Sequence, residues 1–251
     1  MIRILAIGNS FSEDATCYLH GIAKAAGVET EVVNLYIGGC PLEKHWQNIE
    51  KKTEKYQRQL NGVLSEQYVT IDEELNAGSW DYIITQQASH DSGWKDTYEP
   101  FLGWIISHIR KKAPEAKLFL HETWAYEIDS DHWGFLRYER DQQKMYERLS
   151  SCYKEMAEKY ELGLIPCGDV IQAMRKKPEF CVQTGGLSLC RDGFHMSYVY
   201  GRYLLACVWA KKLLGISLEG NTFVPRSVFS EEQADETLLA VIRDAVDSFE
   251  M

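Results

Sequence analysis

The feature that most constrains the fold is a repeated alternation of short apolar runs with stretches of helical period. The first apolar run, residues 2–7, is followed by apolar residues at helical spacing up to Gly27. The pattern recurs along the chain, and the expected strands are residues 2–7, 31–36, 81–85, 117–121 and 162–166. Strands that alternate with helices favour a parallel sheet covered on both faces. The sequence therefore predicts an α/β fold.

Helices are expected after most of these strands. Their predicted ranges are residues 98–112, 138–160, 169–176 and 198–214, with a last helix at about 230–250 that starts at Ser-Glu-Glu. The stretch 41–78 is the least regular. We interpret it as an insertion beside the active edge, with a helix over 42–52 and a hairpin formed by 56–60 and 68–71. A length of 251 residues fits one large α/β domain, and we expect a single domain over residues 1–251.

Charge and cysteine content narrow the class of protein. The chain has 27 Lys and Arg against 37 Asp and Glu, a net charge of −10, which argues against a duplex nucleic-acid binder. No apolar run approaches the roughly 18–20 residues of a membrane span, and the start lacks a signal-type cleavage site.

The seven cysteines are scattered without a C-x-x-C pair, so we expect buried thiols in a reducing compartment. These features predict a cytoplasmic protein.

Chemically active side chains follow several of the expected strands. Ligands of open α/β sheets bind outside the carboxyl ends of the strands, so these positions are the candidate site. The candidates are Ser10 after the first strand, Gly39 after the second, Gln86, Gln87 and His90 after the third, and Asp192 and His195 in a loop before the helix at 198–214.

Ser10 lies between a strand and a helix, where free N–H groups favour developing negative charge. It is a candidate nucleophile, although Ser10 or Ser12 alone would also suit a helix N-cap. Asp192 and His195 are spaced so that the carboxylate can reach Nδ1 while Nε2 faces the cleft. An N-cap Asp with an unrelated His is the simpler alternative. A metal site is disfavoured because no second His lies at i+4.

Donors for an oxyanion are also present at this edge. Gly39 lets a substrate carbonyl approach a backbone N–H, although an ordinary turn glycine looks the same. Gln87 is the preferred side-chain donor because it lies nearer the loop than Gln86, and His90 is the runner-up. Together these residues supply a nucleophile, a base, an orienting acid and oxyanion donors.

Four blocks of the sequence resemble the SGNH (GDSL-like) hydrolase superfamily. They are Gly-Asn-Ser-Phe-Ser at 8–12, Gly-Gly-Cys-x-Leu-x-x-His-Trp at 38–46, Trp-Asp-Tyr-x-x-x-Gln-Gln-Ala-Ser at 80–89 and Asp-Gly-x-His at 192–195. This combination is closest to an uncharacterised bacterial branch, and the resemblance spans roughly residues 2–215. It implies a flavodoxin-like three-layer α/β/α sandwich with five parallel strands. It also implies the activity of an esterase, lipase, thioesterase or carbohydrate deacetylase, without a required metal or cofactor.

The resemblance also implies roles for single residues. Ser10 matches the nucleophile, Asp192 and His195 match the rest of the triad, and the Ser10 and Gly39 N–H groups match oxyanion donors. Asn9 stands where the superfamily motif has Asp. The third block lacks Gly-x-Asn-Asp and instead resembles the glutamine-containing block of sialate and xylan O-acetylesterases, which assigns the third donor to Gln87.

Aromatic residues near the predicted edge suggest the substrate class. Trp46, Trp94 and Trp124 are predicted to bind substrate, because ring faces beside polar groups suit a sugar. Such rings also serve as lids and core plugs. We therefore expect a small-molecule ester as the partner, with an O-acetylated carbohydrate as the leading class. The alternatives are a lipase or thioesterase of the same superfamily and a non-catalytic carbohydrate-binding protein.

Overall fold

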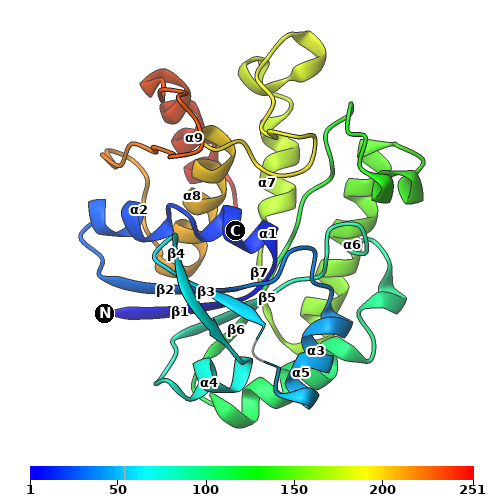
Figure 1. Ribbon diagram of the computed structural model, residues 1–251. Helices are drawn as coiled ribbons and strands as arrows, with labels where there is room; N and C mark the ends of the chain where they lie inside the picture. Colours follow the sequence, from blue (N-terminus) through cyan, green and yellow to red (C-terminus); the bar gives the residue numbers. More distant parts are fainter. Residues whose placement is uncertain (54) are drawn as a thin grey trace.

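A seven-stranded sheet runs through the centre of the computed structural model, which describes residues 1–53 and 55–251 (Figure 1). The strands lie in the order β4-β3-β2-β1-β5-β6-β7. Their bounds are β1 (Ile2–Gly8), β2 (Thr30–Tyr36), β3 (Tyr56–Leu60), β4 (Val63–Val69), β5 (Tyr82–Thr85), β6 (Lys117–His121) and β7 (Gly163–Ile165). The sheet thus has seven strands where five were expected.

The two additional strands form an antiparallel hairpin at one edge. The strands β2, β1, β5, β6 and β7 pair in parallel, at the five positions where strands were predicted. The hairpin β3–β4 pairs with the outer edge of β2, where Asn34 donates to Gln59 across the strands at 2.7 Å. Its turn is Asn61-Gly62, with positive φ at both residues. Asn-Gly is a strong hairpin signal, and it places β4 at 63–69 instead of the predicted 68–71.

Helices cover both faces of the sheet. The helices are α1 (Ser10–Thr16), α2 (Leu19–Ala25), α3 (Leu42–Lys51), α4 (Ile71–Asn76), α5 (Phe101–Lys112), α6 (Gln142–Tyr160), α7 (Cys167–Met174), α8 (Tyr200–Leu214) and α9 (Glu236–Ser248), with short 3₁₀ turns η1 (Lys95–Thr97), η2 (Trp133–Tyr138), η3 (Pro178–Phe180) and η4 (Val182–Thr184). In Figure 1, α1, α2, α7, α8 and α9 lie on one face and α3 to α6 on the other. The arrangement is a three-layer α/β/α sandwich.

Local hydrogen bonds explain where the helices depart from prediction. The last helix begins at Glu236, six residues after Ser230, because the Asp235 side chain caps it by accepting the N–H of Thr237. Asp141 likewise caps α6, which therefore starts after the predicted residue 138. The short helix α4 was not predicted at all. It starts after Thr70, where Thr70 and Glu73 form a capping box.

The core lies on both sides of the parallel strands. Residues Ile4 to Ile7 of β1 are buried, as expected for a strand covered on both faces. The helix α8 is buried over nearly its whole circumference, because it packs between α1, α2 and α9. This burial fixes α1, and with it the segment that follows β1.

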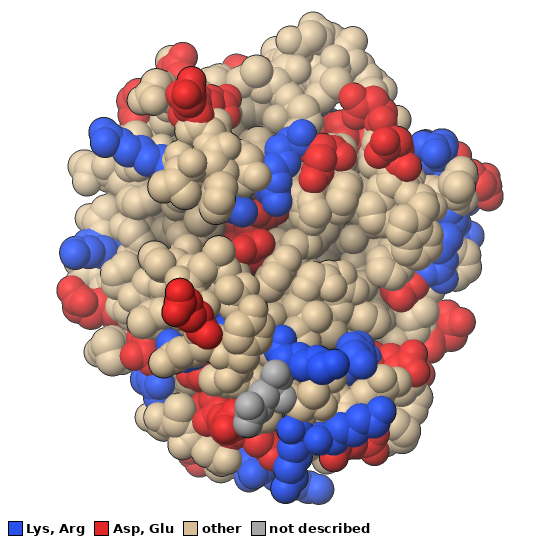
Figure 2. All heavy atoms as spheres, in the orientation of Figure 1, with Lys and Arg blue, Asp and Glu red and all other residues tan. Residues whose placement is uncertain are grey.

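On the face shown in Figure 2, Lys and Arg side chains are interspersed with Asp and Glu, with uncharged residues between them. Within the described residues, no helix combines the length and the hydropathy that a bilayer crossing requires. All seven cysteines in that part of the chain are free, and five of them are buried.

The topology creates a crevice between β1 and β5. The connection that leaves β1 runs over one face of the sheet, whereas the connection that leaves β5 runs over the other. Such a switch point opens a crevice beyond the carboxyl ends of the two strands. The residues that follow β1 and β5 therefore meet there.

Candidate active site

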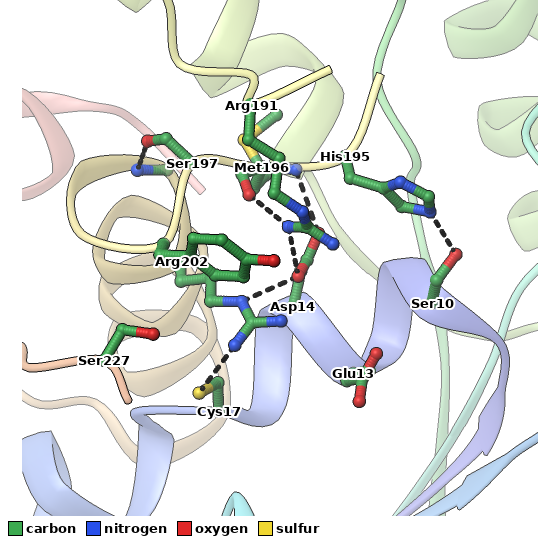
Figure 3. A network of polar contacts seen from close by, with 12 residues as sticks. Ser10, Glu13, Asp14, Cys17, Arg191, His195, Met196, Ser197, Arg202 and Ser227 are labelled. Atoms are coloured by element: carbon green, nitrogen blue, oxygen red, sulfur yellow. Dashed lines mark hydrogen bonds and ion pairs between the residues drawn. The ribbon is translucent and has the colours of Figure 1, made fainter. Parts of the chain in front are cut away.

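Three side chains form a hydrogen-bonded series at the carboxyl end of β1. Ser10 Oγ lies 2.8 Å from His195 Nε2, although the two residues are 185 positions apart in the sequence. His195 Nδ1 lies 2.7 Å from Asp192 Oδ2. Figure 3 shows the His195 ring directed from its loop toward Ser10 on α1. The fold thus brings together the three residues for which a triad was predicted.

The local structure around Ser10 leaves its hydroxyl available. Asn9 is the N-cap of α1, and its side chain accepts the N–H of Phe11 at 3.0 Å. Ser12 is buried and donates to Asn34 Oδ1 at 2.7 Å. Neither serine is the cap, so the simpler alternative for Ser10 does not hold. Its hydroxyl can donate to His195 instead.

The loop that carries Asp192 and His195 folds around the carboxylate. Asp192 Oδ1 accepts the backbone N–H of His195 at 2.7 Å and that of Phe194 at 3.2 Å. Gly193 permits this turn by adopting a φ of +83°. Burial raises the pKa of Asp192, but the hydrogen bonds from His195 and Phe194 outweigh it and hold the pKa below its ordinary value.

The ionised Asp192 sets the tautomer of the neutral His195 ring. A carboxylate at Nδ1 favours the proton on that nitrogen, which leaves Nε2 as the acceptor. Nε2 faces the Ser10 hydroxyl. The arrangement can therefore move the Ser10 proton to His195 and stabilise the resulting imidazolium.

A cavity of about 220 Å³ opens beside Ser10 and His195. Its walls include Tyr36, His90, His132 and Phe194, together with the backbone at Gly39. Burial lowers the pKa of His90 and of His132, so both rings favour the neutral form. The cavity is therefore small, aromatic and lined by neutral imidazoles.

Two backbone N–H groups at this cavity are free. Those of Ser10 and Gly39 donate to no acceptor within the described residues. Gly39 has a φ of +62°, and a Cβ built there meets nothing within 4 Å. The glycine is thus needed for the left-handed backbone conformation rather than to avoid crowding. Gly39 therefore lines the cavity, and its role as an oxyanion donor stays a prediction.

Gln87 does not lie at this cavity, which corrects its prediction as the third donor. Its Oε1 accepts the N–H groups of Leu42 and Ala88, and its Nε2 donates to the Thr97 carbonyl at 2.8 Å. The alternative Gln86 is also engaged, because its Nε2 donates to Asn9 Oδ1 at 2.8 Å. These buried amides tie neighbouring loops together. Of the residues considered for this role, His90 alone lines the cavity.

The three predicted substrate-binding tryptophans also lie elsewhere. Trp124 is fully buried, stacks on Phe11 at 4.0 Å and donates to the Phe194 carbonyl. Trp46 packs against Trp104. The guanidinium groups of Arg137 and Arg148 each lie 4.7 Å from the ring centroid of Trp94. None of the three lines the cavity, and Trp124 supports the site from behind.

Sequence reasoning missed three rings of the cavity wall. Tyr36 ends β2, and Phe194 lies between Asp192 and His195, so both were within reach of the strand-end argument. His132 lies in a loop without periodic pattern, and nothing in the sequence marks it. Its Nδ1 accepts the N–H of Gly134 at 3.0 Å, which places the proton of the neutral ring on Nε2.

Comparisons with known proteins agree with this architecture. A family model described as a domain of unknown function, DUF4886, matches residues 3–240. A DUF4886 family protein from Bacteroides uniformis has a TM-score of 0.88 and 34% identity, covering 98% of this chain and 93% of that chain. No curated protein matches the sequence.

Two more distant structures share the fold. A lipase/acylhydrolase from Enterococcus faecalis has a TM-score of 0.58 and 17% identity, covering 86% of this chain and 96% of its own. An acetylxylan esterase from Geobacillus stearothermophilus has a TM-score of 0.55 and 13% identity, and the match covers 86% of this chain and 95% of that chain. This chain therefore shares its fold with a lipase/acylhydrolase and an acetylxylan esterase.

Proposed function

This chain belongs to the DUF4886 family, and we propose that it is a serine esterase that hydrolyses a small acyl ester. The observation that carries the proposal is the 2.8 Å contact between Ser10 Oγ and His195 Nε2 beside a cavity with two free N–H groups. A nucleophile, a base and an oxyanion site at one place are what acyl transfer requires.

The proposed reaction has two steps. Ser10 Oγ attacks the ester carbonyl carbon while His195 Nε2 takes the hydroxyl proton, and the Ser10 and Gly39 N–H groups hold the oxyanion. The C–O bond to the leaving alcohol then breaks, and His195 returns the proton to that alcohol. Water attacks the acyl-enzyme with His195 again as base, which releases the acid and restores Ser10.

His90 is the third oxyanion donor in this proposal. It follows β5 and lines the cavity, and burial lowers its pKa, so the neutral ring carries one N–H. Its Nε2 lies 3.4 Å from Asp91 Oδ2, so this role requires the N–H to face the oxyanion instead of that carboxylate. A neutral donor suits an oxyanion site because it need not lose a proton during turnover. Gln86 and Gln87 cannot serve without breaking the buried hydrogen bonds that hold their loops.

The size of the cavity supports a small acyl group such as acetyl. About 220 Å³ is less than the roughly 300–1,000 Å³ of sites for drug-sized ligands. His90, His132 and Phe194 offer ring faces and N–H donors, which suit a sugar as the alcohol part. The shared fold with an acetylxylan esterase is consistent with this class. An O-acetylated carbohydrate is therefore the proposed substrate class.

The direct test is the Ser10→Ala variant. It should lose nearly all hydrolysis of an activated acetate ester while keeping its fold by circular dichroism, because no other hydroxyl contacts His195 Nε2 in the described residues. Wild-type activity in Ser10→Ala would refute the mechanism.

A substrate comparison tests the acyl group and the alcohol. Acetylated sugars should react with a higher kcat/KM than long-chain acyl esters. The reverse preference would indicate a lipase or thioesterase, and sugar binding without hydrolysis by wild type would indicate a binding protein.

A further inference from the structure

We propose that Asp14 is a positioning residue that holds the His195 loop in register with Ser10. The inference rests on the proposed function, because it assigns a second layer of residues to the same site. Asp14 lies on α1, four positions after Ser10 and therefore on the same side of the helix. Its side chain is fully buried and points from α1 toward the loop that carries His195 (Figure 3).

The Asp14 carboxylate binds both flanks of that loop. Arg191 Nη1 lies 3.0 Å from Oδ1, and the backbone N–H of Met196 lies 2.9 Å from Oδ2. Arg191 directly precedes Asp192, and Met196 directly follows His195. The two residues that form the acid–base pair are thus enclosed between two anchor points on one carboxylate.

A second arginine fixes the carboxylate from the other side. Arg202 of α8 is buried, and its Nε donates to Asp14 Oδ1 at 2.7 Å. Its Nη1 donates to Cys17 Sγ at 3.5 Å, which ties α8 to the end of α1. An ionised carboxylate without partners is costly to bury, and here each oxygen accepts more than one hydrogen bond. Because both carboxylate oxygens have their hydrogen bonds satisfied, the network holds Asp14 and its partners in one arrangement.

The loop itself is closed by backbone contacts. The Arg191 N–H donates to the His195 carbonyl at 2.9 Å, and Cys190 pairs with Met196 in an isolated bridge. Arg191 also donates to the Met196 carbonyl. The loop thus behaves as one unit, and its position relative to Ser10 depends on what holds its two ends.

The acid–base pair cannot position itself. The Asp192 side chain is 41% exposed and that of His195 is 21% exposed, so their ion pair lies at the rim of the site. Ion pairs at the surface contribute little to stability. The fully buried Asp14 network lies directly behind the same loop. It is therefore the stronger determinant of the distance between His195 and Ser10.

The test compares Asp14→Asn with a matched control, Glu74→Gln. Glu74 is a buried carboxylate on α4 that binds Arg58 through two contacts of 2.8 and 3.1 Å, outside the site. Both variants should lower the thermal midpoint. Asp14→Asn alone should lower kcat by about 10- to 100-fold with little change in KM, the cost of a small misplacement of catalytic groups.

A second variant covers the case in which Asp14→Asn does not fold. Arg191→Gln removes a partly exposed partner but leaves Arg202 and Met196 in contact with Asp14. It should lower kcat in the same direction by a smaller factor. An unchanged kcat in a folded variant, or an equal loss in Glu74→Gln, would overturn the positioning role.

A readout independent of turnover separates the two proposals. The ¹⁵N NMR signal of His195 Nε2 should show in wild type that this nitrogen accepts a hydrogen bond from Ser10, because the two atoms lie 2.8 Å apart. The signal should shift toward that of an imidazole without this hydrogen bond in Asp14→Asn and stay at the wild-type position in Glu74→Gln. If wild type shows the signal but reacts with no ester, the proposed function fails alone. If Asp14→Asn keeps the wild-type signal, the positioning role fails alone.

Discussion

At the scale of single residues, the site depends on neighbouring residues that make the structural hydrogen bonds, so that the reactive groups do not have to make them. Asn9 caps α1, so Ser10 keeps its hydroxyl for His195. Gly39 supplies a positive φ, so its N–H can face the cavity. The motif types of Ser10, Gly39, Asp192 and His195 were recognisable in the sequence. The sequence did not reveal that the Gln87 amide points away from the cavity, because strand alternation does not tell which loop carbonyl an amide will bind.

Gly39→Ala tests the oxyanion site against a matched control. Gly27 also has a positive φ, of 75°, and open space around a built Cβ, but it lies after α2, outside the cavity. Both alanine variants should lose about 1–2 kcal/mol of stability from backbone strain. Only Gly39→Ala should lose kcat, because relief of the strain turns its N–H away from the cavity; the loss should not exceed about 10²–10³-fold, the cost of removing a donor outright. Equal kcat values for the two variants would contradict the assignment.

At the scale of elements, the sequence was most informative where burial is complete. The parallel strands β1 and β2 were predicted to within a residue, because runs that are mostly buried on both faces have a simple apolar pattern. The hairpin strand β3 was predicted at its observed bounds, but β4 was misplaced and α4 was missed, because exposed elements depend on turn and cap chemistry. The signals were present in Asn61-Gly62 and in the Thr70–Glu73 capping box.

Thr70→Ala tests whether the capping box defines α4. The Thr70 hydroxyl accepts the N–H of Glu73 at 3.0 Å, and its loss should reduce the free energy of unfolding by about 1 kcal/mol. Urea denaturation measures this change. Esterase kcat should stay at the wild-type value because α4 lies outside the site. A loss of kcat at full folding would show instead that α4 supports catalysis.

At the scale of the whole molecule, buried titratable groups shape the dependence of stability on pH. Burial lowers the pKa of His45 and of His121 to about 3, from an ordinary 6.5. Between these values the unfolded chain binds protons that the folded chain does not. The free energy of unfolding should therefore fall as the pH drops below 6.5, by up to about 1.4 kcal/mol per pH unit for each histidine.

Glu122 acts in the opposite direction. Burial and the nearby Asp169 raise its pKa to about 8, from an ordinary 4.5. The folded chain holds this proton where the unfolded chain has lost it, so stability falls as the pH rises toward 8. Stability should therefore be greatest near pH 6.5. Glu122→Gln should flatten the decline between pH 6.5 and 8 in urea titrations, and an unchanged slope would contradict the assignment.

The long-range contacts of the molecule set the limit of what the sequence could reveal. The alternation of strands and helices predicted the layers and the edge at which Ser10 and His195 meet. It did not predict Asp14, whose partners Arg191 and Arg202 lie 177 and 188 positions away. Nor did it predict that Trp46, Trp94 and Trp124 would pack away from the cavity. Such contacts arise from tertiary packing, which produces no periodic pattern in the sequence.

The measurement that tests the central claim most directly is labelling of the purified protein with a fluorophosphonate. Such probes modify a serine only when a neighbouring base activates it. Intact mass and peptide mapping should find one adduct per chain, on Ser10, and the His195→Ala variant should lose it. An unlabelled wild-type protein, or an adduct on another residue that survives in His195→Ala, would contradict the account.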